Sequence, residues 1–123
     1  MLNNLLYVFL GGGIGSAARF GISMLMVNYY RGSFPIATLI SNTLSCLALG
    51  LTVFLMGEKL NTDLPLRFFL ITGFCGGFST FSAFSYETID MLKNGYMLYA
   101  LLNVLLSVLV CFGILYLFIR SNA

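Results

Sequence analysis

The segment Thr72-Gly-Phe-Cys-Gly-Gly-Phe-Ser-Thr-Phe-Ser-Ala-Phe-Ser-Tyr-Glu87 interrupts a long apolar stretch with residues that form helices poorly. Each glycine inside a helix costs about 1 kcal/mol relative to alanine, and serine and threonine compete for the backbone hydrogen bonds. We therefore predict a break in the helix near Gly76 to Thr80. Irregular backbone at membrane depth survives only where protein buries it or where it lines a cavity, and its carbonyls can coordinate a cation. The break is thus a predicted site.

Four apolar stretches account for most of the chain. It has 123 residues, of which 59% are hydrophobic and 8% are charged, whereas ordinary soluble domains carry about 25% charged residues. A helix needs about 20 mostly apolar residues to cross the hydrocarbon. We predict an all-α membrane protein, a single domain over residues 1–123 with four transmembrane helices. The stretches run from Leu2 to about Val27, Phe34 to about Met56, Leu66 to about Leu92, and Tyr96 to Ile119.

The composition also excludes several classes of protein. The net charge is +2 without a block of basic residues, so we expect no binding of nucleic acid. The chain has no histidine, and neither a nucleophile paired with a base nor a cofactor motif is evident, so we expect no enzyme. Cys46, Cys75 and Cys111 fall inside predicted spans, where a thiol packs as a small hydrophobe. We expect no partner, disulfide or metal for them.

The charged residues of the loops are divided almost equally between the two sides of the membrane. Four spans place both termini on one side, which then holds Lys59, Arg67 and Arg120, while the other side holds Arg31 and Lys93. An excess of Lys and Arg normally marks the cytoplasmic side, so this near balance gives little orientation signal. We predict insertion in both orientations and an antiparallel homodimer with a two-fold axis in the membrane plane. A fixed orientation on the weak bias is the alternative.

The first span contains a run of small residues followed by a cation. Gly11 and Gly15 form a small-xxx-small face on which two helix backbones can approach closely. Arg19 lies one turn further on, still within the apolar stretch. We expect a structural role for Arg19, either snorkelling toward an interface or bonding to helix-end carbonyls, with an anion site as the alternative.

Polar side chains recur at helical spacing in the second and fourth spans. Residues three or four apart share a helix face, so each set points its donors in one direction. In the fourth span such a line of neutral donors suits an anion that must keep moving, because a fixed cation at low dielectric would hold the anion too tightly. In the second span the functional interpretation of Asn42 is an ion ligand. Packing between helices is the alternative for both sets. The sets are Thr38, Asn42 and Ser45 in the second span, and Tyr99, Asn103 and Ser107 in the fourth.

Two aromatic residues follow the predicted break. Phe81 and Phe84 are three residues apart and therefore share a helix face. An aromatic ring carries partial positive charge at its edge, so rings held edge-on can replace part of the hydration of an anion. Ordinary packing of the rings against neighbouring helices is the alternative.

These motifs resemble those of a known family. The runs Gly11-Gly-Gly-Ile-Gly-Ser-Ala-Ala-Arg19, Thr38-Leu-Ile-Ser-Asn42 and, above all, Gly73-Phe-Cys-Gly-Gly-Phe-Ser-Thr-Phe-Ser-Ala-Phe-Ser-Tyr-Glu87 resemble the Fluc (CrcB) family of small dual-topology fluoride channels. The resemblance covers nearly the whole chain. It implies a fluoride-selective channel that exports F⁻ passively across the prokaryotic plasma (inner) membrane, which lowers fluoride toxicity in the cytoplasm. It also implies a multi-pass antiparallel homodimer with two pores.

The resemblance implies roles for particular residues as well. A structural Na⁺ at the dimer centre would be held by the backbone carbonyls of Gly76 and Ser79, the latter a threonine in the usual pattern. Arg19 and Glu87 match family positions with a structural or vestibule role. Asn103 stands where the pattern has serine or threonine. The implied fluoride pore comprises Thr38, Asn42, Phe81, Phe84, Tyr99, Asn103 and Ser107.

Two other functions remain open. A small multidrug exporter is also a four-helix chain, often of dual topology, and it exchanges protons for a cationic drug through a carboxylate in its first span. The first span of this chain has no Asp or Glu, which argues against such an exporter. A non-transporting membrane assembly subunit would use the same polar groups for packing alone, and it predicts no ion flux.

Overall fold

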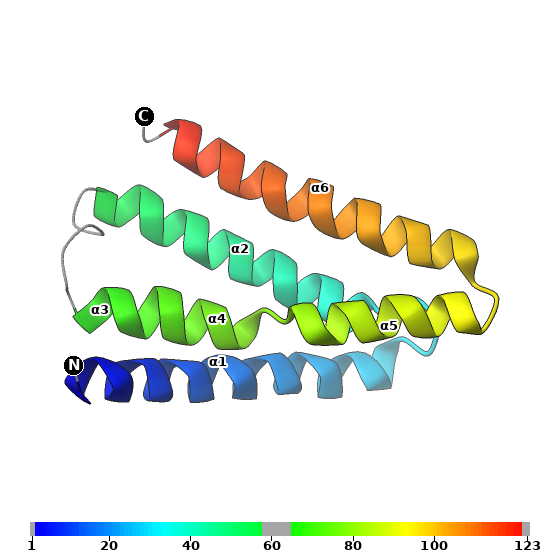
Figure 1. Ribbon diagram of the computed structural model, residues 1–123, viewed down its shortest axis with the longest axis horizontal. Coiled ribbons are helices and arrows are strands. Elements are labelled where there is room, and N and C mark those ends of the chain that lie inside the picture. Colours follow the sequence, from blue (N-terminus) through cyan, green and yellow to red (C-terminus); the bar gives the residue numbers. More distant parts are fainter. Residues whose placement is uncertain (1, 58–64, 122–123) are drawn as a thin grey trace.

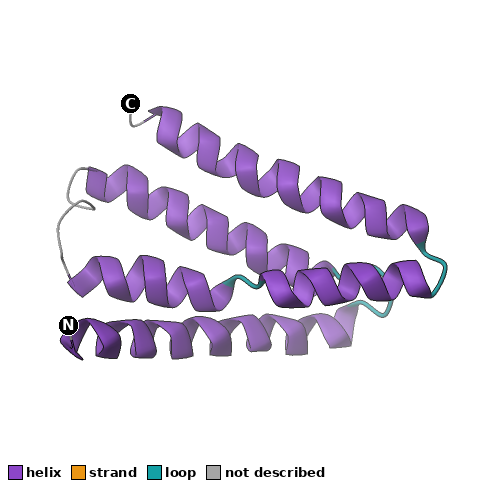
Figure 2. Ribbon diagram, in the orientation of Figure 1, coloured by secondary structure: helices purple, strands orange, loops and turns teal. Residues whose placement is uncertain are grey.

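The computed structural model describes residues 2–57 and 65–121, and every regular element within them is a helix (Figures 1 and 2). Four runs, Leu2–Tyr29, Ile36–Met56, Pro65–Lys93 and Met97–Ser121, are long and apolar enough to cross a membrane, which confirms the predicted number of spans. Lys59, one of the loop charges counted above, lies outside the described residues. The elements are α1 (Leu2–Tyr29), α2 (Ile36–Met56), α3 (Pro65–Arg67), η2 (Phe68–Cys75), α4 (Gly76–Phe78), α5 (Phe81–Lys93) and α6 (Met97–Ser121).

The spans are arranged as two neighbouring pairs. In Figure 1, α1 lies beside the third span and runs in the same direction, while α2 and α6 run the opposite way. The contacts agree, since α1 packs on η2 and α4, and α2 packs on α6. The third span joins the pairs, because α5 also contacts α6. As a result, α1 begins and α6 ends at the same end of the bundle, as an even number of spans requires.

Glycine determines how closely α1 approaches the third span. A Cβ atom added to Gly11 would overlap the carbonyl oxygen of Phe69, and one added to Gly15 would overlap that of Phe74. Both glycines are buried. The hydrophobic effect does not drive helices together inside the membrane, because lipid tails are as apolar as the side chains. Membrane helices therefore associate through such close backbone packing. The packing face predicted for Gly11 and Gly15 is therefore confirmed.

The interior of the bundle is more polar than its exterior. Large apolar side chains such as Phe9 and Leu55 are 75% and 71% exposed, as expected of surfaces that face lipid. Among the described residues the buried apolar side chains are only Cys75, Phe78, Met91 and Ala100. The buried polar side chains are Thr38, Ser41, Ser45, Asn103 and Ser107.

A short glycine turn folds α6 back onto α5. Gly95 has a φ of 88°, a left-handed conformation that favours glycine. Its N–H donates to the Leu92 carbonyl at 3.3 Å, and the next N–H, that of Tyr96, donates to the Met91 carbonyl at 2.8 Å. This pair of bonds is the Schellman arrangement that satisfies the last carbonyls of a helix. The turn therefore ends α5 and lets α6 contact both α5 and α2.

Candidate functional site

The third span changes its backbone conformation four times between α3 and α5. It is π-helical over η2, α-helical over α4, and extended at Ser79 (φ −85°, ψ 158°) and Thr80 (φ −152°, ψ 118°) before α5 begins. Irregular backbone was predicted from Gly76 onward, but Gly76 has helical angles (φ −65°, ψ −35°). The physical reason is that the glycines serve close packing, since a Cβ on Gly77 would overlap the carbonyl oxygen of Gly12 in α1. The π-helical turns of η2 had no signal in the sequence analysis.

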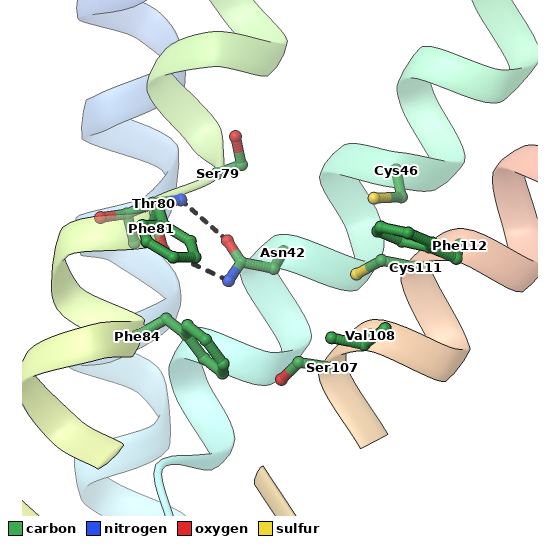
Figure 3. Close-up of a pocket in the computed structure, with 10 residues that line it drawn as sticks. All are labelled: Asn42, Cys46, Ser79, Thr80, Phe81, Phe84, Ser107, Val108, Cys111 and Phe112. Atoms are coloured by element: carbon green, nitrogen blue, oxygen red, sulfur yellow. Dashed lines mark hydrogen bonds between the residues drawn. The ribbon is translucent and has the colours of Figure 1, made fainter. Parts of the chain in front are cut away.

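The side chain of Asn42 in α2 pairs with the extended backbone (Figure 3). The Thr80 N–H donates to Asn42 Oδ1 at 2.8 Å, and Asn42 Nδ2 donates to the Thr80 carbonyl at 3.4 Å. The hydroxyl of Thr80 in turn accepts the N–H of Ala83 at 3.2 Å, so Thr80 caps the start of α5. The carboxamide thus replaces the hydrogen bonds that a continuous helix would make at this point.

These contacts remove the usual donors from two carbonyls. In a continuous helix the Thr80 N–H would bond to the Gly76 carbonyl and the Ala83 N–H to the Ser79 carbonyl. Here the first N–H donates to Asn42 and the second to the Thr80 hydroxyl. The carbonyls of Gly76 and Ser79 are those that the family resemblance assigns to Na⁺. Carbonyl oxygens are ligands that hard cations accept, so the donor set fits such an ion.

The carbonyl of Cys75 anchors α2 to the end of α4. It accepts the Ser45 hydroxyl at 2.9 Å, the Ser79 hydroxyl at 2.9 Å and the Ser79 N–H at 3.1 Å. Ser45 was predicted as part of a polar stripe and is 3% exposed. Its hydroxyl is therefore engaged in fixing the third span against α2.

A cavity of about 250 Å³ opens beside the Asn42 carboxamide, between α2, α5 and α6 (Figure 3). Its wall offers amide, hydroxyl, thiol and aromatic groups, and none of the ten lining residues is Asp, Glu, Lys or Arg. It includes five residues singled out by the sequence analysis, Asn42, Ser79, Phe81, Phe84 and Ser107, together with Cys46, Thr80, Val108, Cys111 and Phe112. Neutral dipoles can stabilise a charged solute without trapping it.

The two phenylalanines that follow the extended residues lie side by side on the cavity wall. The ring centroids of Phe81 and Phe84 are 5.7 Å apart, and the ring planes are inclined at 43°. Phe81 is 78% exposed, comparable to Phe9 in α1. Figure 3 shows the two rings on the α5 side of the Asn42 carboxamide.

The predicted polar residues of α6 divide between the cavity and a helix contact. Asn103 is 1% exposed, and its Nδ2 donates to the Thr88 hydroxyl of α5 at 2.9 Å. The Ser107 hydroxyl lies 3.5 Å from Asn103 Oδ1. Ser107 lines the cavity and Asn103 does not. In this structure Asn103 thus links α6 to α5 through Thr88.

The third member of that stripe, Tyr99, lies among aromatic rings. Its ring is edge-on to Phe34 at 6.0 Å and stacked on Tyr96 at 5.8 Å. Tyr99 is 40% exposed and does not line the cavity.

The remaining predicted residues lie outside the cavity. Thr38 is 9% exposed and sits beside the carboxyl group of Glu87, whose Oε1 is buried without a hydrogen-bond partner among the described residues. Arg19 Nε donates to the Gly77 carbonyl at 3.2 Å, near the end of α4. This is the bonding to helix-end carbonyls that the sequence analysis weighed for Arg19.

The sequence analysis missed two residues of the cavity that a stricter use of spacing would have found. Cys46 lies four residues after Asn42, and Cys111 lies four residues after Ser107. Side chains four apart share a helix face, so each cysteine continues a polar stripe. Both side chains line the same cavity, Cys46 from α2 and Cys111 from α6 (Figure 3). The sequence analysis did not place these two cysteines at one site, because spacing within one helix does not reveal what the neighbouring helix presents.

Comparison with known proteins agrees with this architecture. A family profile described as "CrcB-like protein, Camphor Resistance (CrcB)" matches residues 6–119. The "Fluoride-specific ion channel FluC" of Flavobacterium psychrophilum is 44% identical over 87% of this chain and 86% of that protein. Proteins with the same name from Coxiella burnetii strain CbuK_Q154 and Shewanella pealeana are 44% and 37% identical, over 88% and 94% of this chain and 88% and 93% of theirs.

Four helices of spanning length and bacterial relatives of nearly equal length identify a multi-pass protein of the prokaryotic inner membrane. The profile match extends from the first turns of α1 to the last turns of α6. The match therefore includes the packing face of Gly11 and Gly15, the extended residues Ser79 and Thr80, and the neutral cavity. The chain belongs to the CrcB-like family.

Proposed function

We propose that this chain forms a fluoride-selective channel, through which F⁻ leaves the cytoplasm passively across the inner membrane. One observation carries the proposal: a cavity at the interruption of the third span is lined by neutral donors and aromatic rings, without a formally charged side chain. The names of the relatives, fluoride-specific ion channels, support the choice of ion. Passive flow needs no catalytic residue, and none is assigned.

The chemistry of the cavity suits a small anion. Moving F⁻ out of water is costly unless donors replace the lost hydration. The Asn42 carboxamide has two N–H groups, of which one bonds to the Thr80 carbonyl. The other N–H and the ring edges of Phe81 and Phe84 are available to an anion. Because these donors carry no net charge, they do not hold the ion against its onward movement.

The proposal extends to a dimer of two oppositely inserted copies, each with the same cavity. The near balance of Lys and Arg between the two sides of the membrane supports it. A pore built at the interface of two copies would place the ring of Phe81, which is 78% exposed in a single chain, against the partner copy. Reporter fusions to the C-terminus test the orientation, since signals from both compartments are expected and a strong signal from one alone contradicts dual insertion.

A structural Na⁺ between the copies is the second extension. The Gly76 and Ser79 carbonyls, left without their helical donors, support it as oxygen ligands. The measurement is the thermal stability of the purified dimer in Na⁺ and in N-methylglucamine at equal ionic strength. A higher melting temperature in Na⁺ is expected, and equal melting temperatures contradict a bound sodium ion.

The deciding experiment is efflux from proteoliposomes loaded with fluoride or chloride, followed with halide-selective electrodes. Rapid release of fluoride with negligible release of chloride is expected. A proton-coupled exporter is disfavoured because α1 contains no carboxylate, and it would require a proton gradient for transport. A non-transporting assembly subunit would leave both halides inside the vesicles, and that result would overturn the proposed function.

A further inference from the structure

Two thiols from different spans lie on the wall of the same cavity. Cys46 belongs to α2 and Cys111 to α6, and both side chains line the cavity (Figure 3). Both cysteines are free and partly exposed, whereas Cys75, also free, is 5% exposed and lies outside this cavity. This cavity therefore presents one pair of accessible sulfur ligands.

A pair of thiols selects a particular class of ligand. Sulfur is a soft donor and favours soft metal cations over hard ones such as Mg²⁺ or Ca²⁺. Zinc sites normally use four protein ligands, or three with a water. No group of three or more His, Cys, Asp or Glu residues that could hold a metal occurs in the described part of the chain. A cation that coordinates two sulfur atoms linearly needs no further protein ligand. Such a cation therefore suits this pair of thiols better than zinc does.

The membrane setting narrows the class of ligand further. A net charge at this depth is costly, so an occupant that leaves the site neutral is favoured. A divalent cation bound by two thiolates meets this condition. As two S–H bonds break and two sulfur–metal bonds form, two protons pass to water. No oxidant or reductant is needed.

We propose that Cys46 and Cys111 form a two-thiolate site for a soft, linearly coordinated divalent cation, with Hg²⁺ as its representative, and that occupancy of this site blocks ion flow. Cys46 lies one turn from Asn42, and Cys111 one turn from Ser107, so a bound metal stands beside the donors of the cavity. It also ties α2 to α6. The block rests on the proposed channel function, whereas the binding does not.

The test uses the full chain, fully reduced and then freed of reductant, with HgCl₂ as the probe. Free thiols are titrated after one equivalent of HgCl₂, and fluoride efflux is measured at increasing HgCl₂ as a fraction of each variant's own metal-free rate. The wild type is compared with Cys46→Ser and Cys111→Ser, which each leave one sulfur ligand. Cys75→Ala is the matched control because its side chain lies outside the cavity. Size-exclusion profiles verify that each variant is folded.

The wild type and Cys75→Ala are expected to lose two thiols per metal ion and to lose efflux at the same HgCl₂ concentration. In Cys46→Ser and Cys111→Ser the concentration for half-inhibition should rise about 100-fold or more, since the second ligand acts at high effective concentration. A dithiol chelator should restore efflux. Equal sensitivity of the wild type and both serine variants, or loss of sensitivity in Cys75→Ala alone, would overturn the site. Loss of two thiols in a chain that never releases fluoride would instead refute the channel and leave the site standing.

Discussion

The carboxamide of Asn42 in α2 pairs with both polar groups of the Thr80 backbone in the third span, accepting its N–H at 2.8 Å and donating to its carbonyl at 3.4 Å. A side chain from one span thus satisfies the extended backbone of another. Unsatisfied backbone groups in hydrocarbon cost several kcal/mol each. The pairing therefore explains how extended residues persist at this depth, and it places the carboxamide on the wall of the cavity.

Replacing Asn42 by aspartate should reduce fluoride efflux at least about tenfold, the factor that 1.4 kcal/mol of added barrier produces. An ionised carboxylate can still accept the Thr80 N–H, but it cannot donate to the Thr80 carbonyl, and its charge repels an anion. The initial rate of fluoride release from proteoliposomes is the measurement. Asn42→Ala is the control, because it removes both hydrogen bonds without adding charge. Flux through Asn42→Asp equal to that of the wild type would exclude Asn42 from the ion path.

Replacing Phe81 or Phe84 by isoleucine should abolish fluoride efflux while the protein remains folded. Isoleucine retains apolar volume but lacks the positive ring edge that can contact an anion. Efflux and size-exclusion profiles are to be recorded together. Phe54→Ile is the matched control, since Phe54 pairs with Phe118 at 6.2 Å, outside the cavity. If both cavity variants conduct normally, the rings serve packing alone.

Replacing Gly15 by alanine should lower the free energy of unfolding by about 1–3 kcal/mol, the usual cost of overpacking. The added methyl group would overlap the Phe74 carbonyl oxygen and force α1 away from the third span. Gly13→Ala is the control on the same helix, because a Cβ there meets nothing within 4 Å. Thermal unfolding in detergent compares the two variants. Equal melting temperatures of Gly15→Ala and Gly13→Ala would show that the contact between α1 and the third span tolerates separation.

Replacing Ser79 by alanine should leave fluoride efflux nearly unchanged. The Ser79 hydroxyl donates only to the Cys75 carbonyl, which retains its bonds from the Ser45 hydroxyl and the Ser79 N–H. The backbone carbonyl proposed to hold Na⁺ is not altered. Thr80→Ala is the contrasting variant, since it removes the cap of α5 at a cost of about 1 kcal/mol. A non-conducting Ser79→Ala would give the hydroxyl a direct role.

The outcome for the polar stripes shows where prediction from sequence ends. Asn42 and Asn103 both recur at helical spacing within apolar spans and have the same side chain. Asn42 lines the cavity, whereas Asn103 is buried against Thr88. Spacing assigns a residue to a face of its own helix. It does not say how that helix is rotated relative to its neighbours, and the rotation decides between a cavity and a helix contact.

The sequence alone determined the four spans, because hydropathy and length are properties of each segment by itself. It also determined the packing face of Gly11 and Gly15, since only small residues allow backbones to touch. Only the tertiary structure decided that the extended backbone of the third span is limited to Ser79 and Thr80, and that Cys46 and Cys111 line the same cavity. Both depend on which groups distant segments bring together, because a hydrogen bond or a shared ligand requires positions in space that no local pattern specifies.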